Sequence, residues 1–414
     1  MRLTAETIPP AALHTDGPGA PIGTNRVGPV VADDGGGADS APQIRVSRPL
    51  MPTFEQLSPF LRQIDAARFY TNGGLLQGKL QHALAAHFGL QSDSIGLAGS
   101  GTAAIIGLLL GTAGRAMPSR PLCVCPAYTF AATACAAIAC GYRPYLADVD
   151  PHSWALDPAT VEALPDIAQV GAVIVVAPYG RAIDLAGWQA FSLRTGVSVV
   201  VDAAASFDTL PIPQITASGL PVAISLHATK TLSTVEGGLM ICTDAALMRR
   251  AMSALNFGFD DRNICAIPGF NGKISEYHAA VGLADLAAWP QKRAAFLMTA
   301  AHYAKAAALC RISGRISVNT VAALPNALFI ARDRAEADRV AMALGSRRID
   351  TRRWYGGGLH THPAYHDAPR TALPVTEVIA GQVLGLPFSV DLPPHDVHGI
   401  VEVIARTLGT TTAV

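Results

Sequence analysis

An alternation of short apolar runs with helical patterns constrains the fold of this chain more than any other feature. Six runs have the length and composition of strands: 121–126, 144–148, 172–177, 197–201, 222–225 and 239–243. Most of the segments between them carry helical spacing: 102–110, 129–139, 158–164, 187–194 and 245–255. Strands that alternate with helices form a largely parallel sheet, whose binding crevice lies at the carboxyl ends of the strands. We therefore predict an α/β fold in which polar residues that end a strand are the functional candidates.

Length and composition divide the chain into three parts. A chain of 414 residues exceeds what one hydrophobic core usually serves. Residues 1–47 are rich in Gly, Pro, Ala and Asp and show no periodicity, so we predict a flexible N-terminal extension there. We assign residues 48–290 to a large domain. Residues 291–414, which include a strand-like run at 327–331, are predicted to form a smaller α+β domain.

Charge and composition argue against several classes of function. Lys plus Arg and Asp plus Glu both number 31, so the chain lacks the charge that attracts a nucleic acid polymer or an anionic membrane. No apolar stretch approaches the roughly 20 residues of a spanning helix, and no signal peptide is visible. The seven cysteines are typical of reduced thiols, and Cys123 and Cys125 lack further ligands at metal-binding spacing. We predict a cytoplasmic protein without a metal site.

Asp202 ends the predicted strand at 197–201. A buried carboxylate in that position is costly unless it meets a cation or several hydrogen-bond donors. The protonated ring nitrogen of pyridoxal phosphate would be such a partner. The alternative is an acid that caps the next helix, which the position alone favours.

Lys230 follows the predicted strand at 222–225, and Gly237 and Gly238 come shortly after it. A lysine in an apolar cleft has a lowered pKa and becomes a nucleophile that can form an imine. An exposed lysine in a turn is the alternative. The neighbouring Ser225 and the paired glycines favour the nucleophile.

A glycine turn and an aromatic residue complete the set of candidates. Gly99-Ser100-Gly101-Thr102 precedes an apolar helix, an arrangement in which free backbone N–H groups hold a phosphate. The turn lacks the third glycine of the dinucleotide fingerprint and the first glycine of a nucleophile elbow. Phe130 follows the strand at 121–126 and is placed to lie flat against a planar cofactor, although a simple core position is the commoner alternative.

In chain order these candidates are a phosphate turn, an aromatic residue, an acid and a lysine. The sequence around them reads "YTNGGLLQGKLQHALAAHFGL", "GSGTAAIIGLLL", "CPAYTFAATACAAIACGYRPYLADVDP", "SLHATKTLSTVEGG", "GFNGKISEYHAAVGL" and "LPVTEVIAGQVLGLPFSVDL". From about Phe69 to Leu408 the chain resembles the sugar aminotransferase family of the DegT and StrS type. The resemblance implies a fold-type-I pyridoxal phosphate enzyme, with a mainly parallel sheet in the large domain and a smaller C-terminal α+β domain.

The resemblance also implies a role for each matching residue. Lys230 would form an imine with the cofactor and later move a proton between cofactor and substrate. Asp202 would pair with the pyridine nitrogen, and Phe130 would stack on the ring. The cofactor phosphate would be held by Gly101, Thr102 and Ser225. Asn271, in "GFNGK", would reach the phosphate of a neighbouring subunit, so the active sites of a homodimer would be shared.

The implied activity moves an amino group from glutamate or glutamine to a nucleotide-linked keto-deoxy sugar. The family usually has the sequence Asp-Ala-Ala-Gln or Asp-Ala-Ala-His at this point, whereas residues 202–205 of this chain are Asp-Ala-Ala-Ala. The side chain of Ala205 cannot supply the usual contact to the cofactor hydroxyl. The sequence "DAAASFD" at 202–208 is similar to that of some branches of the family that make 4-amino sugars, and it slightly favours amination at C4 of the sugar. Lys230 separates the chain from related dehydratases, in which a histidine replaces the lysine. A cyclitol or other ketone as acceptor, and a non-catalytic regulatory relative, are the alternatives.

Overall fold

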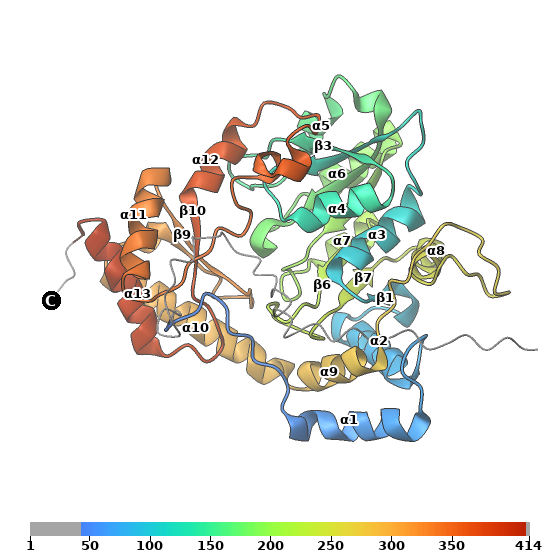
Figure 1. Ribbon diagram of the computed structural model, residues 1–414, viewed down its shortest axis with the longest axis horizontal. Coiled ribbons are helices and arrows are strands. Elements are labelled where there is room, and N and C mark those ends of the chain that lie inside the picture. The colour runs from blue at the N-terminus through green and yellow to red at the C-terminus, as the bar shows by residue number, and fades with distance from the viewer. Residues whose placement is uncertain (1–42, 411–414) are drawn as a thin grey trace, which may run out of the picture. The chain divides into compact units, whose positions relative to one another are not determined.

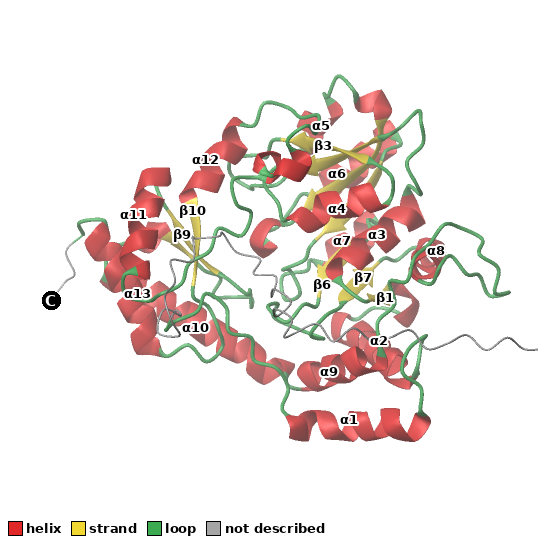
Figure 2. Ribbon diagram, viewed as in Figure 1, coloured by secondary structure: helices red, strands yellow, loops and turns green. Residues whose placement is uncertain are grey.

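The computed structural model describes residues 43–410, in which ten strands form two separate sheets (Figure 1 and Figure 2). The strands are β1 (Ile95–Ala98), β2 (Leu122–Pro126), β3 (Arg143–Ala147), β4 (Val170–Val176), β5 (Ser198–Asp202), β6 (Val222–Ser225), β7 (Gly238–Ile241), β8 (Ile316–Ser317), β9 (Ala327–Ile330) and β10 (Val383–Leu386).

The larger sheet has seven strands in the order β1-β7-β6-β5-β4-β2-β3 and is mainly parallel. Every neighbouring pair from β6 to β3 is parallel, whereas β7 runs antiparallel to both β6 and β1. This confirms the predicted α/β fold. The six predicted strands are β2 to β7, with ends that differ by at most two residues. The sequence patterns did not reveal β1, a strand of four residues.

Helices cover both faces of this sheet, and four further α-helices lie in residues 289–407 (Figure 2). They are α1 (Phe54–Ala67), α2 (Leu75–Phe88), α3 (Gly101–Thr112), α4 (Ala131–Ala139), α5 (Pro158–Glu162), α6 (Leu185–Thr195), α7 (Ile212–Ser218), α8 (Ala245–Leu255), α9 (Glu276–Ala287), α10 (Trp289–Leu309), α11 (Arg334–Gly345), α12 (Pro374–Gln382) and α13 (Pro394–Thr407).

The central strands of the larger sheet bury both of their faces. In β4, Val173 and Val175 belong to one hydrophobic cluster, and Ala172 and Ile174 belong to another on the opposite side of the sheet. Because side chains alternate along a strand, a strand buried on both faces must be apolar throughout. This is why continuous apolar runs in the sequence identified the central strands.

The second sheet, in the order β10-β9-β8, is antiparallel and is accompanied by α11, α12 and α13. We call residues 51–288 the large lobe and residues 310–410 the small lobe; α10 connects them. The predicted domain border at residue 290 falls at the start of α10, and its position stays a prediction. None of the helices in residues 43–410 is both long and apolar enough to span a membrane.

Residues 43–50, which we call the strap, join the start of the described chain to the small lobe. Ile44 forms a β-bridge with Ile349, and Ser47 forms one with Phe388. The amide of Phe388 also donates to the carbonyl of Val46 at 3.1 Å. The predicted extension therefore includes a few residues that pair with the small lobe, whereas its residues 1–42 lie outside the described part of the chain.

Candidate active site

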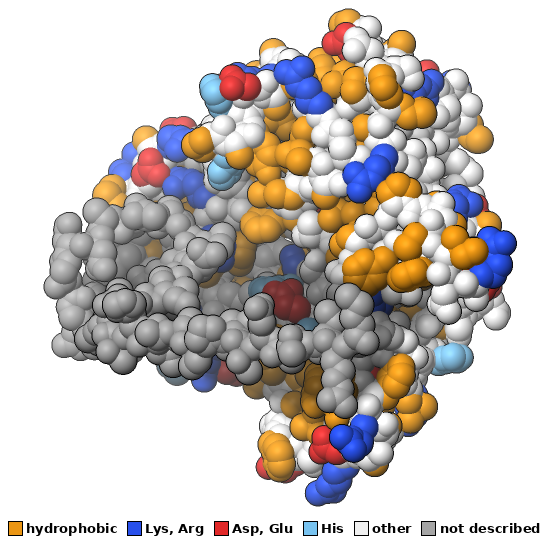
Figure 3. Space-filling view, turned by 45° about the vertical axis from the view of Figure 1, so that its right-hand side comes forward, with side chains coloured by type: hydrophobic (Ala, Val, Ile, Leu, Met, Phe, Trp, Pro, Cys, Tyr) orange, Lys and Arg blue, Asp and Glu red, His pale blue; other side chains and the backbone are white. Residues whose placement is uncertain are grey.

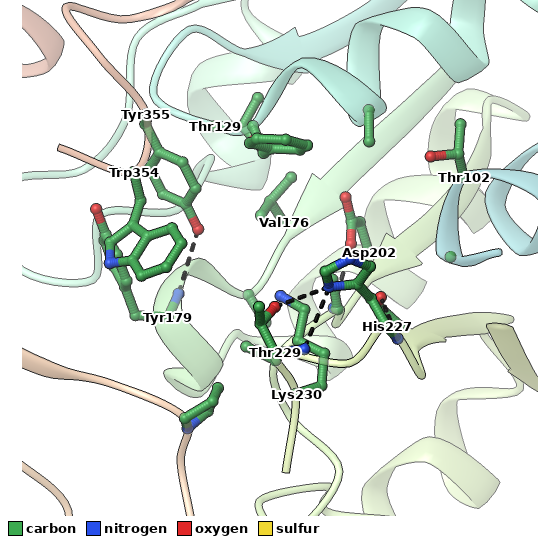
Figure 4. A pocket seen from close by; sticks show the side chains of 18 of the residues that line it. Thr102, Thr129, Val176, Tyr179, Asp202, His227, Thr229, Lys230, Trp354 and Tyr355 are labelled. Atoms are coloured by element: carbon green, nitrogen blue, oxygen red, sulfur yellow. Dashed lines mark hydrogen bonds between the residues drawn. The ribbon is translucent and has the colours of Figure 1, made fainter. Parts of the chain in front are cut away.

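A cavity of about 310 Å³ lies at the carboxyl ends of the parallel strands, between the large lobe and loops of the small lobe (Figure 4). Six of the seven residues predicted from the sequence line it: Gly101, Thr102, Phe130, Asp202, Ser225 and Lys230. Ligand sites of doubly covered sheets occupy this same edge. The parallel topology thus brings together residues that lie up to 129 positions apart in the chain, from Gly101 to Lys230.

One end of the cavity is the start of α3. Ser100 caps this helix, because its hydroxyl accepts the amide of Ala103 at 3.0 Å. The amides of Gly101 and Thr102 come first in the helix and have no acceptor within it. A Cβ at Gly101 would lie only 2.9 Å from Cβ of Ser225, so only glycine allows the helix start to approach β6 this closely. These features provide a site for a phosphate or another anion.

Asp202 lies at the end of β5 and is only 5% exposed. Its carboxylate accepts the hydroxyl of Thr133 at 2.9 Å and the amide of Ala204 at 3.2 Å. Burial raises the pKa of Asp202 despite these two donors. The helix-cap alternative is wrong, because the next helix, α7, begins only at Ile212. An acid held in this way can pair with a cationic group of a ligand in the cavity.

Lys230 lies in the loop after β6, and its side chain lines the cavity near Asp202 (Figure 4). Its amide donates to the carbonyl of His227 at 2.8 Å, and the amide of Thr229 donates to Nδ1 of His227 at 3.2 Å. Burial lowers the pKa of Lys230, while the charge of Asp202 opposes this shift. The exposed-turn alternative does not describe this lysine. A larger fraction of uncharged amine makes it a better nucleophile.

Phe130 precedes α4 and is 48% exposed, with its side chain against the cavity. The alternative that it fills the core is therefore wrong. Ala205 also lines the cavity, where its methyl group offers no hydrogen bond. That part of the wall is apolar.

Asn271 is the predicted site residue that does not line this cavity. It is exposed, and its backbone forms an isolated bridge with Asn256 in the segment after α8. Its position therefore gives it no contact with a ligand in the cavity of its own chain. A role toward a second subunit stays a prediction.

The sequence patterns did not predict the side of the cavity that comes from the small lobe. This wall consists of Pro325, Asn326, Arg352, Trp354 and Tyr355. Tyr355 packs against Tyr179 of the large lobe, with ring centroids 4.7 Å apart, and its hydroxyl accepts the amide of Tyr179 at 3.4 Å. Figure 4 shows Trp354 and Tyr355 facing the cavity from the side opposite Asp202. The run "RRWYGGG" was a signal, since two aromatic residues beside three glycines are unusual in an ordinary loop.

The residues of the cavity fit pyridoxal phosphate. The start of α3 suits its phosphate, the buried Asp202 suits its ring nitrogen, and the amine of Lys230 suits its aldehyde. A side chain at Gly101 would collide with Ser225, so glycine keeps the two segments that would hold the phosphate close together. The arrangement can therefore hold a planar, phosphorylated cofactor and present an amine to it.

The model of the DegT/DnrJ/EryC1/StrS aminotransferase family matches residues 55–405. Protein Rv3402c of Mycobacterium tuberculosis is 28% identical over 384 residues, which cover 89% of this chain and 91% of that protein. The dTDP-4-amino-4,6-dideoxy-D-glucose transaminase of Shigella dysenteriae is 31% identical over 245 residues, 59% of this chain and 64% of that protein. The crystal structure of DesI with its TDP-sugar product has a TM-score of 0.77 at 25% identity, covering 88% of this chain and 92% of DesI.

Proposed function

Because the chain belongs to the DegT/DnrJ/EryC1/StrS aminotransferase family, we propose that it transfers an amino group from glutamate or glutamine to a nucleotide-linked keto-deoxy sugar. Membership in this family confirms the enzyme class, an aminotransferase, and the cofactor, pyridoxal phosphate, that the sequence predicted. The sugar, the carbon that is aminated and the amino donor are parts of the proposal.

The observation that carries the proposal is the shared cavity of Lys230 and Asp202 beside the start of α3. When bound, pyridoxal phosphate supplies an electron-withdrawing ring that stabilises the charge left on a substrate carbon when it loses a proton. Asp202 would keep the ring nitrogen protonated. Burial lowers the pKa of Lys230, and its Nζ would move the proton between the carbons of substrate and cofactor.

The small-lobe wall supports a sugar acceptor. Trp354 and Tyr355 offer apolar ring faces, while Asn326 and Arg352 offer polar groups at the same wall. A pocket with both kinds of surface suits a ring that carries hydroxyl groups on some edges and C–H groups on others. The Shigella dysenteriae relative is described as a transaminase of a 4-amino sugar, which agrees with the slight preference for C4 from "DAAASFD".

We also propose a homodimer with shared sites. Asn271 is exposed, and the neighbouring segment leaves Phe257 46% and Ile264 52% exposed. Figure 3 shows groups of hydrophobic side chains on the face that it presents, with Lys and Arg side chains between them. Exposed apolar surface of this kind is typical of protein interfaces. A cytoplasmic location also stays a prediction from the sequence.

The test is a panel of nucleotide-linked keto sugars, with the ketone at C3 or C4, and of cyclitol ketones, combined with glutamate, glutamine and other amino donors. Formation of the amino sugar is measured by mass spectrometry with purified, cofactor-loaded protein. We expect at least about tenfold higher kcat/KM for a C4 ketone with glutamate or glutamine as donor, which is about 1.4 kcal/mol of discrimination. Turnover of cyclitol ketones alone would contradict the sugar assignment. Absence of both turnover and a visible cofactor band would favour the non-catalytic alternative.

A further inference from the structure

Helix α9 carries two buried carboxylates, Glu276 and Asp285, and each is 3% exposed. A buried carboxylate is costly unless it accepts hydrogen bonds or meets a cation. Each of these two accepts backbone amides from a segment far away in the sequence. Glu276 binds the start of α2, whereas Asp285 binds the loop that carries Lys230. The first contact is structural, and the second lies beside the active site.

Glu276 holds the start of α2. Its two carboxylate oxygens accept the amides of Leu76 at 2.7 Å and Gln77 at 2.9 Å. The residue at the N-cap position of α2 is Gly74, which has no side chain to accept them. Glu276 thus replaces a missing helix cap, and none of these residues lines the cavity of Lys230.

Asp285 holds the loop that carries Lys230. One of its oxygens accepts the amide of Ser233 at 2.8 Å. The Nζ of Lys292, at the start of α10, lies 2.8 Å from both of its oxygens. The side chains of Asp285 and Lys292 are 4% and 9% exposed, so this is a buried ion pair.

Ser233 is the residue on which the loop closes. Its hydroxyl donates to the carbonyl of Leu226 at 3.2 Å and accepts the amide of Val235 at 2.9 Å. The amide of Ala228 donates to the carbonyl of Val235 at 2.8 Å, so both sides of the loop are tied together. Lys230 lies between these ties. A displacement of Ser233 would therefore change the direction in which Lys230 points.

Lys292 and Lys230 also line one small cavity of about 20 Å³ behind the loop. The ammonium group of Lys292 is buried beside this loop and is costly there unless it meets an anion. The two oxygens of Asp285 bind Lys292 and neutralise it there.

From these contacts we infer that Asp285 is a positioning residue for Lys230: it fixes the active-site loop through the amide of Ser233 and keeps Lys292 paired. The inference rests on the proposed role of Lys230 as the lysine that holds the cofactor. It does not depend on the identity of the sugar.

The test compares Asp285→Ala with Glu276→Ala, a control on the same helix with the same exposure. Two properties of the cofactor-loaded proteins are measured: hydrogen exchange of the segment 226–237, and the dissociation constant for pyridoxal phosphate. Asp285→Ala should speed exchange in this segment and weaken cofactor binding about tenfold, because the amide of Ser233 loses a charged acceptor and the buried ammonium of Lys292 loses its partner. Glu276→Ala should speed exchange only near the start of α2 and leave cofactor affinity unchanged.

Asp285→Asn provides a second variant if Asp285→Ala does not fold. It keeps an oxygen for Ser233 but leaves Lys292 unpaired, so we expect the same local pattern with about threefold weaker cofactor binding. Wild-type exchange in 226–237 and wild-type affinity in the folded variant would overturn the inference, as would equal effects from Glu276→Ala. Because no sugar is used, failure of the sugar panel is a separate result. If Lys230→Ala keeps the visible spectrum of the wild-type protein, then Lys230 does not hold the cofactor and the proposed function is at fault.

Discussion

The two sides of the active-site cavity are built by different means. On the large-lobe side, Gly101 begins α3, Asp202 ends β5 and Lys230 lies in the loop after β6. The backbone of these elements fixes their positions. On the small-lobe side, Trp354 and Tyr355 lie in a loop between α11 and α12. Tyr355 packs on Tyr179, and the guanidinium of Arg352 lies over the ring of Trp354. The first side has the groups that suit the cofactor, and the second has surfaces that suit a variable acceptor. Such a division lets substrate preference change without changing the chemistry.

The comparison predicts that large-lobe substitutions affect the chemical step most. Lys230→Ala should reduce amino transfer at least about 10³-fold, because no other lysine within residues 43–410 lines the cavity. The measurement is steady-state turnover, and circular dichroism serves as a control for folding. Substantial turnover by this variant would remove the lysine from its assigned role.

Asp202→Asn should lower kcat by about 10²-fold, because an amide cannot neutralise a protonated ring nitrogen. The same change should stabilise the apoprotein. Burial raises the pKa of Asp202, so this group favours the folded state below its unfolded pKa and loses that contribution as pH rises through the folded pKa. We therefore expect a melting temperature about 2 °C above wild type at pH 7 and equal to it near pH 3. A lower melting temperature at pH 7 would show that the carboxylate is stabilising.

Trp354→Ala tests the small-lobe side. We expect the KM for the sugar to rise about tenfold while kcat and the affinity for pyridoxal phosphate stay near wild type, because an aromatic face that only binds substrate affects KM alone. Initial rates at varied sugar concentration measure both constants. A fall in kcat without a change in KM would mean that the two sides are not separate.

A mixture of two inactive variants tests whether a second subunit contributes a third side to the active-site cavity. Lys230→Ala and Asn271→Asp proteins are mixed under conditions that allow subunit exchange. If Asn271 serves the partner, one site of each mixed dimer carries both changes and the other carries neither, so activity should return to about half of wild type per mixed dimer. If subunits exchange but activity does not return, Asn271 acts in the site of its own chain.

The sequence predicted the parts of the fold that depend on local pattern. The central strands were found because they are buried on both faces, and Asp202 was found because it ends one of them. Gly101 and Lys230 were found by other signals: a glycine turn before an apolar helix, and a lysine between Ser225 and paired glycines. β1 was missed because Ile95–Ala98 contains a single β-branched residue and is a strand only through its antiparallel pairing with β7. Trp354 and Tyr355 were missed because their loop reaches the cavity only when the small lobe packs on the large one. The run "RRWYGGG" marks the loop as unusual, but it does not indicate which part of the large lobe the loop contacts.

The strap has a consequence for how the chain folds. It pairs Val46 with Asp350, 304 positions away, and it also pairs with Phe388. All strands of the large lobe lie between Ile95 and Ile241, so that sheet can form during synthesis before the strap's partners have left the ribosome. Contacts between such distant segments form slowly, because closing a long loop costs entropy. We therefore expect the small lobe to be completed last and to be the final part of the newly made chain to become resistant to proteases.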